Sequence, residues 1–140
     1  MTDMTSLACE LKNEVEWQKT PSPLSLHDYT AFIKRAIKRL YVDTGRASAF
    51  RDYSFSTSGN REMFSGTLGV DEETYVMLLA QIDFFKKVQT DVNVMVSYTT
   101  DALSVAGGDK PYAHLKDSID KLENERRIVY YKMVTYALGS

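Results

Sequence analysis

The C-terminal part of the chain carries its most regular pattern of apolar positions. After Pro111, the pattern recurs at alternating spacings of three and four residues. The positions on this repeat are Tyr112, Leu115, Ile119, Leu122, Arg126, Val129, Met133 and Tyr136. Heptad spacing is typical of a helix that lies along another helix. We therefore predict a long terminal helix with Pro111 in its first turn, where proline is well suited.

Residues 26–43 are predicted to form a second helix with one apolar and one basic face. Ser25, followed three residues later by Asp28, is typical of a helix start, and Gly45 is a suitable stop. The apolar face consists of Tyr29, Phe32, Ile33, Ala36, Ile37, Leu40 and Tyr41. The opposite face carries Lys34, Arg35, Lys38 and Arg39.

Residues 72–98 are predicted to form the longest helix, with Asp71 as its N-cap. One apolar stripe contains Tyr75, Leu78, Ile82, Phe85, Val92 and Val96, and the other contains Met77, Ala80, Phe84, Val88 and Met95. A helix that is apolar on two sides belongs at the centre of a domain. We expect the 26–43 helix to cover one stripe and the terminal helix to cover the other.

The remaining segments have weaker patterns. Residues 5–19 form a weakly amphipathic helix that ends before the breaker Pro21-Ser22-Pro23. Residues 46–70 lack helical periodicity, but a turn at Ser58-Gly59-Asn60 favours a small hairpin. Residues 99–110 connect the two long helices.

These elements predict an all-α fold with three main helices, a weak N-terminal helix and an irregular or small β-hairpin insertion around 46–70. A chain of 140 residues is long enough for one hydrophobic core. We divide it into an N-terminal arm or weak helix, residues 1–24, and a single helical domain, residues 25–140.

The composition is that of an ordinary soluble protein, with 44% hydrophobic and 26% charged residues. A net charge of −2 excludes a generally basic nucleic-acid coat protein. The single cysteine, Cys9, cannot form an intramolecular disulfide and fits a reducing compartment. No apolar run approaches the roughly 18 residues of a membrane span, and the N-terminus lacks the basic region of a signal peptide. We expect an intracellular protein without a membrane partner.

No residue pattern predicts catalysis. His27 and His114 have no second His or Cys at metal-ligand spacing, and Cys9 has no activating base nearby. Gly107-Gly108 lacks the Gly-Lys-Ser/Thr continuation of a phosphate-binding loop. We therefore predict no enzyme activity, no metal and no cofactor.

Two features remain open to a functional interpretation. The basic face at Lys34, Arg35, Lys38 and Arg39 is either a phosphate-tracking surface or an ordinary solvated helix face. Arg126 interrupts the apolar repeat of the terminal helix. Either its stem lies over apolar neighbours with its head in water, or it makes a polar contact that fixes the register of a helical assembly.

The order of elements resembles a known family. A long helix ends in Tyr98-Thr99-Thr100-Asp101-Ala102-Leu103-Ser104-Val105, and a glycine-bearing turn and a terminal helix follow. Over residues 72–136 this resembles the head-to-tail connector, or adaptor, proteins of tailed bacteriophages. The chain departs from many members by having Ala102-Leu103-Ser104 where they have a glycine after the aliphatic residue.

The resemblance implies a structural virion protein that is made in the bacterial cytoplasm. It implies a homo-oligomeric ring between portal and tail proteins, with non-specific contact to DNA in the channel. Candidate subunit or portal contacts are Leu103, Val105, Arg126 and Tyr130, and the basic face of residues 34–39 is the candidate channel lining. The alternative is a cytoplasmic helical regulatory or interaction module that binds a partner helix or nucleic acid.

Overall fold

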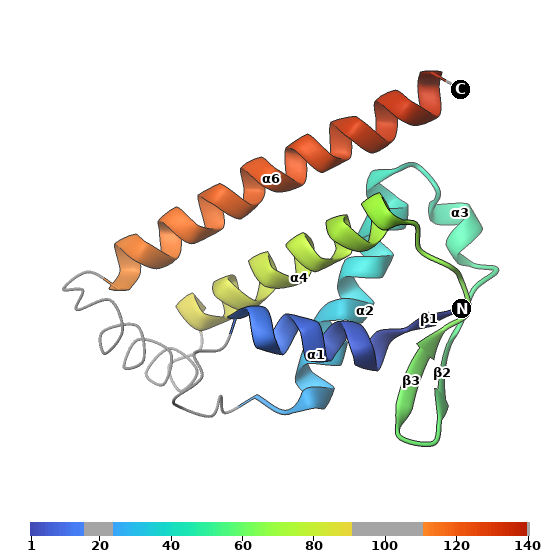
Figure 1. The fold of residues 1–140 in the computed structure, drawn as a ribbon, viewed down its shortest axis with the longest axis horizontal. Helices are drawn as coiled ribbons and strands as arrows, with labels where there is room; N and C mark the ends of the chain where they lie inside the picture. Colours follow the sequence, from blue (N-terminus) through green and yellow to red (C-terminus); the bar gives the residue numbers. More distant parts are fainter. Residues whose placement is uncertain (16–23, 91–110, 140) are drawn as a thin grey trace.

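A computed structural model describes residues 1–15, 24–90 and 111–139. The chain is largely helical, and a small antiparallel sheet packs at one end (Figure 1). The described helices are α1 (Met4–Val15), α2 (Leu26–Asp43), α3 (Ala47–Phe50), α4 (Val70–Thr90) and α6 (Pro111–Gly139). The strands are β1 (Thr2–Asp3), β2 (Phe55–Ser58) and β3 (Arg61–Phe64). The all-α prediction is therefore wrong in its strict form, because the sheet is present.

Helix α2 matches its predicted boundaries because both of its ends are capped. The Ser25 hydroxyl accepts a hydrogen bond from the Asp28 amide, and the Asp28 carboxylate accepts one from the Ser25 amide. At the other end, Gly45 adopts a left-handed conformation with φ 73°. The amides of Gly45 and Arg46 then bond to the carbonyls of Val42 and Tyr41, which completes a Schellman motif.

Helix α4 lies at the centre, as its two apolar stripes predict. It contacts α6 on one side and α1 and α2 on the other (Figure 1). Phe84 packs on Tyr29 of α2 at a centroid distance of 5.9 Å, whereas Tyr75 packs on Tyr130 of α6 at 6.4 Å. The two stripes are thus covered by the two predicted helices. Val92, Met95 and Val96, and residues 16–19 of the predicted first helix, lie outside the described residues.

The predicted N-cap of α4 is wrong. The helix begins at Val70, so Asp71 lies inside its first turn. The carboxylate of Glu72 accepts a hydrogen bond from the Gly69 amide at 3.0 Å, and the Gly69 carbonyl accepts one from the Glu73 amide. Gly69 therefore occupies the capping position, and Glu72 satisfies its amide as the third residue of a capping box does.

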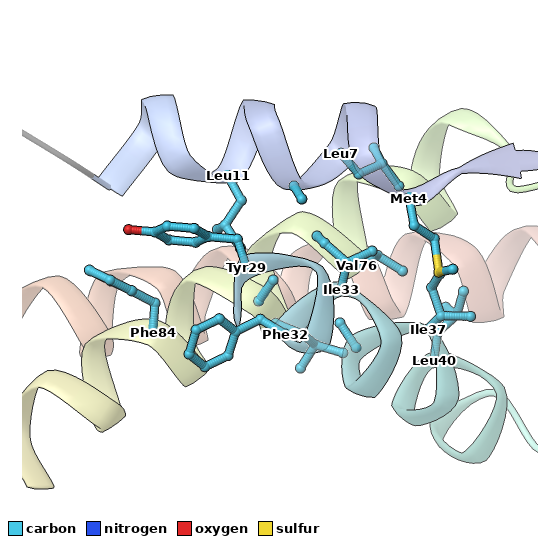
Figure 2. Close-up of a cluster of buried hydrophobic side chains, with 14 of the residues drawn as sticks. Met4, Leu7, Leu11, Tyr29, Phe32, Ile33, Ile37, Leu40, Val76 and Phe84 are labelled. Carbon is cyan, nitrogen blue, oxygen red and sulfur yellow. The ribbon is translucent and has the colours of Figure 1, made fainter. Parts of the chain in front are cut away.

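Helix α1 belongs to the same core as α2 and α4. Met4, Ala8 and Leu11 are fully buried. The side chains of Met4 and Leu11 point toward α2, which α1 contacts (Figure 2). The segment expected to be an N-terminal arm or weak helix thus forms a helix whose apolar side packs in the core. Burial of several large side chains stabilises a helix that would be marginal alone.

The predicted hairpin exists and is anchored by a third strand. Ser58 pairs with Arg61 across the two-residue loop Gly59-Asn60, and Gly59 has φ 62°, as in a type II′ turn. β1 pairs with β3 on the side opposite β2, with Thr2 facing Phe64. Neither β1 nor the single turn of α3 is predicted by the sequence pattern.

Phe64 is the centre of an aromatic cluster that joins the sheet to the helices. Its ring is fully buried, and its centroid lies 5.4 to 6.1 Å from the rings of Tyr41, Phe50, Tyr53 and Phe55. Gly66 lies so close that an added Cβ would be 2.6 Å from the Phe64 ring. The sheet is therefore held by close packing around one side chain.

We expect Phe64→Ala to lower the free energy of unfolding by about 3–5 kcal/mol, because it leaves a cavity at the centre of the cluster. Urea denaturation followed by circular dichroism measures this. Phe55→Ala is the control, since Phe55 is 36% exposed and its loss should cost clearly less. Equal losses for the two variants would show that the cluster is not organised around Phe64.

Candidate functional site

The described part of the chain holds no group of three or more His, Cys, Asp or Glu side chains placed to bind a metal ion. His27 is exposed, and its Nδ1 lies 3.7 Å from the Glu62 carboxylate. Cys9 is an exposed free thiol on α1. The His114 side chain lies outside the described residues. The features that remain are surfaces and one buried polar network.

The predicted basic face is largely engaged with the chain itself. Lys34 donates to Glu62 at 2.7 Å, and this hydrogen bond lowers the pKa of Glu62. Arg39 donates to Asp43 at 3.3 Å. Arg35 lies over the Phe32 ring at 4.9 Å. Of the four residues, only Lys38 has neither an ion pair nor a ring contact within the described residues.

Those contacts favour an ordinary helix face over a phosphate-tracking surface. A cation that already shares a carboxylate contributes less to the release of DNA counterions. The four residues nevertheless remain together on one side of α2, and Lys38 and Arg39 are exposed.

Arg126 makes a polar contact inside the chain. Its guanidinium donates from Nε to Glu123 at 3.0 Å and from Nη1 to the Tyr75 hydroxyl at 3.1 Å. Tyr75 in turn donates to Asp43 at 2.6 Å, and Arg39 donates to the other oxygen of Asp43. This Tyr75 network links α6, α4 and α2. Of the two interpretations of Arg126, the structure supports a polar contact, made to α4 of the same chain.

Tyr75 is the buried member of this network. Its side chain is fully buried, and its hydroxyl both accepts from Arg126 and donates to Asp43. Burial, together with the hydrogen bond to Asp43, raises the pKa of Tyr75 to about 12. The neutral phenol is therefore the form that the folded chain favours.

Of the other predicted contact residues, the structure describes only Tyr130. Leu103 and Val105 lie outside the described residues. Tyr130 is half-buried and packs against Tyr75 and Tyr131 at centroid distances of 6.4 and 5.7 Å. Arg126 and Tyr130 thus both face α4 of their own chain, so the most exposed apolar surface of α6 lies elsewhere.

That surface is the outer side of α6, which the repeat of the sequence did not single out. Ile128 is 67% exposed and Tyr131 is 63% exposed, three residues apart and therefore adjacent on the helix. The repeat positions Ile119, Leu122, Val129 and Met133 pack against the core, so Ile128 and Tyr131 project from the other side. The sequence could have indicated this surface, because Ile128 and Tyr131 are large apolar residues that do not occupy positions of the apolar repeat.

No helix among the described residues combines the length and apolar character that a membrane crossing requires. No protein-family model matches the chain, and no curated protein or solved structure is significantly similar to it.

We expect Tyr75→Phe to lower the free energy of unfolding at neutral pH by about 1–3 kcal/mol. The variant leaves the half-buried Arg126 and Asp43 without their shared hydroxyl. Chemical denaturation measures the loss. Tyr131→Phe removes a hydroxyl from an exposed ring and should leave stability unchanged. If Tyr75→Phe has the same free energy of unfolding as the wild type, the hydrogen bonds of the Tyr75 network do not contribute to stability.

The same network predicts a loss of stability at alkaline pH. The pKa of Tyr75 is raised in the folded chain, so its contribution is complete below the unfolded pKa of about 10. It is then lost as the pH rises toward about 12, because the unfolded chain releases the proton first. Denaturation at a series of pH values should show a smaller slope for Tyr75→Phe. Some slope remains, since burial also raises the pKa of Tyr41.

Proposed function

We propose that this chain is a structural subunit of the head-to-tail connector of a tailed bacteriophage, which assembles with its own copies into a ring beneath the portal. The observation that carries the assembly role is the outer side of α6, where Ile128 and Tyr131 are two-thirds exposed on one helix face. Large apolar residues grouped on an otherwise charged surface are typical of protein interfaces.

Three further features support a role in binding rather than catalysis. α6 is a 29-residue helix that contacts α4 along one side, and no other described element packs extensively on it. Tyrosine, which occurs nine times, combines a large contact area with a polar tip and is enriched at interfaces. The polar groups of the Tyr75 network bond to one another. The connector assignment itself rests on the resemblance of residues 72–136.

We expect the purified chain to self-associate, alone or on a portal protein, as measured by light scattering. The double variant Ile128→Ser with Tyr131→Ser should weaken this association, because it removes the exposed apolar pair from the outer side of α6. Leu26→Ser is the control, since Leu26 is a 38% exposed apolar residue on α2. A wild-type chain that stays monomeric and ignores the portal would exclude the connector role.

A further inference from the structure

A groove of about 350 Å³ lies between α1 and α4, apart from the outer side of α6. Its lining combines acidic and apolar side chains. The acidic ones are Glu10, Glu14 and Glu73, and the apolar ones are Val70, Met77 and Leu78. Val70 is 85% exposed. Such a groove suits an occupant that is both cationic and partly apolar.

The three carboxylates of the groove have no cation beside them. Within residues 1–15, 24–90 and 111–139, neither Glu10 nor Glu14 nor Glu73 forms an ion pair. Among the described residues, five acidic side chains outside the groove are paired. Those with a Lys or Arg within ion-pair distance are Asp3, Asp43, Glu62, Glu72 and Glu123. The groove therefore gathers three carboxylates that have no ion-pair partner among the described residues.

A complementary surface exists on α2 of the same chain. Arg35, Lys38, Arg39 and Val42 are spaced three, one and three residues apart, so they form one stripe along the helix. All four are exposed, and Val42 is 55% exposed. The α2 stripe thus presents three cations followed by an aliphatic side chain, although Arg39 also bonds to Asp43 and Arg35 lies over the Phe32 ring. The positive charge and the apolar side chain of the stripe complement the carboxylates and the apolar lining of the groove.

The stripe and the groove lie on different sides of the molecule. Gln81 of α4 lines the groove. Asp83 lies two residues further, which is about 200° around the helix. Burial raises the pKa of Asp83, and the charges of Arg35 and Arg39 oppose that shift, so the stripe is near Asp83. A chain therefore cannot place its own stripe in its own groove.

We propose that the α1–α4 groove receives the α2 stripe of a second copy of this chain. The contact pairs Arg35, Lys38 and Arg39 of one copy with the three groove carboxylates of the next, and Val42 with the apolar lining. The two surfaces differ, so the contact is head-to-tail, and a pair of copies is left with one free groove and one free stripe. Such contacts close into rings or continue as filaments. The inference rests on the proposed function and adds a second subunit contact to the one at the outer side of α6.

Charge-reversal variants test the groove and the stripe separately. The groove variant is Glu10→Lys with Glu14→Lys, and the stripe variant is Arg35→Glu with Lys38→Glu. All four residues are on helix surfaces, and circular dichroism checks that both variants fold. Each variant should raise the dissociation constant of self-association about tenfold or more, because it sets like charges against each other. Glu14→Lys alone is compared with Asp52→Lys, an equal change of charge at an exposed carboxylate outside the groove.

Mixing the two variants gives the sharper result. The altered groove of the first variant and the altered stripe of the second carry opposite charges, whereas each variant keeps one normal surface. In the mixture, head-to-tail pairs form through the restored and the unchanged contacts, so light scattering should show stronger association than either variant shows alone. A chain that carries all four reversals should assemble by itself, since its groove and stripe are complementary again.

The outcomes separate this inference from the proposed function. If both variants assemble like the wild type, the ring uses another surface: this inference is overturned and the connector role stands. If the stripe variant instead loses salt-dependent DNA binding while its assembly is unchanged, the stripe serves nucleic acid and the inference is again overturned. A monomeric wild type that ignores the portal overturns both.

Discussion

The whole structure depends on α4 being apolar on more than one side. Val76, Ala80 and Val88 are fully buried, and Phe84 is nearly so, while Tyr75 is buried on a different side of the helix. A helix of this kind cannot be stable at a surface, because water would contact one of its apolar sides. The other elements are arranged to exclude that water. α1 and α2 cover one side, and α6 covers the other (Figure 1).

Close packing alone leaves the position of α6 along α4 weakly determined, and the Tyr75 network determines it. A heptad repeat of similar apolar side chains tolerates a shift by one repeat, whereas a hydrogen bond from Arg126 to Tyr75 does not. Burial makes this restriction strong, since an unpaired guanidinium or carboxylate at the same depth would be costly. The network also extends to Asp43 at the end of α2. Three helices are therefore fixed relative to one another by one tyrosine hydroxyl.

The same arrangement decides which surfaces are open to partners. Arg126 and Tyr130 face α4, so α6 presents Ile128 and Tyr131 outward. The arrangement of α1 beside α4 creates the acidic groove, and the cations of α2 lie on another side. A subunit with one self-complementary surface would form a closed dimer, whereas two different complementary surfaces permit a ring. The separation of the groove from the stripe is thus a consequence of how the helices cover α4.

Sequence pattern alone predicted the helix ends and the hairpin that depend on residues close together in the chain. The boundaries of α2 follow from Ser25, Asp28 and Gly45, which satisfy backbone groups within a few residues of themselves. The first residue of α6 follows from Pro111, and the hairpin follows from its glycine turn. The start of α4 was misplaced by two residues, because Asp71 is a good capping residue by type. Only the hydrogen bond between Gly69 and Glu72 shows which residue caps the helix.

The sequence by itself determined which sides of the helices are apolar and where most of them begin. Periodicity encodes this, since each residue's burial depends on its angle around its own helix. Only the tertiary structure decided the partners. β1 has two residues and no periodicity, and it exists because β3 lies beside it. Asp43 meets Tyr75 across 32 residues of chain, and Glu14 shares a groove with Val70. Such pairs depend on how helices pack, which no local spacing specifies.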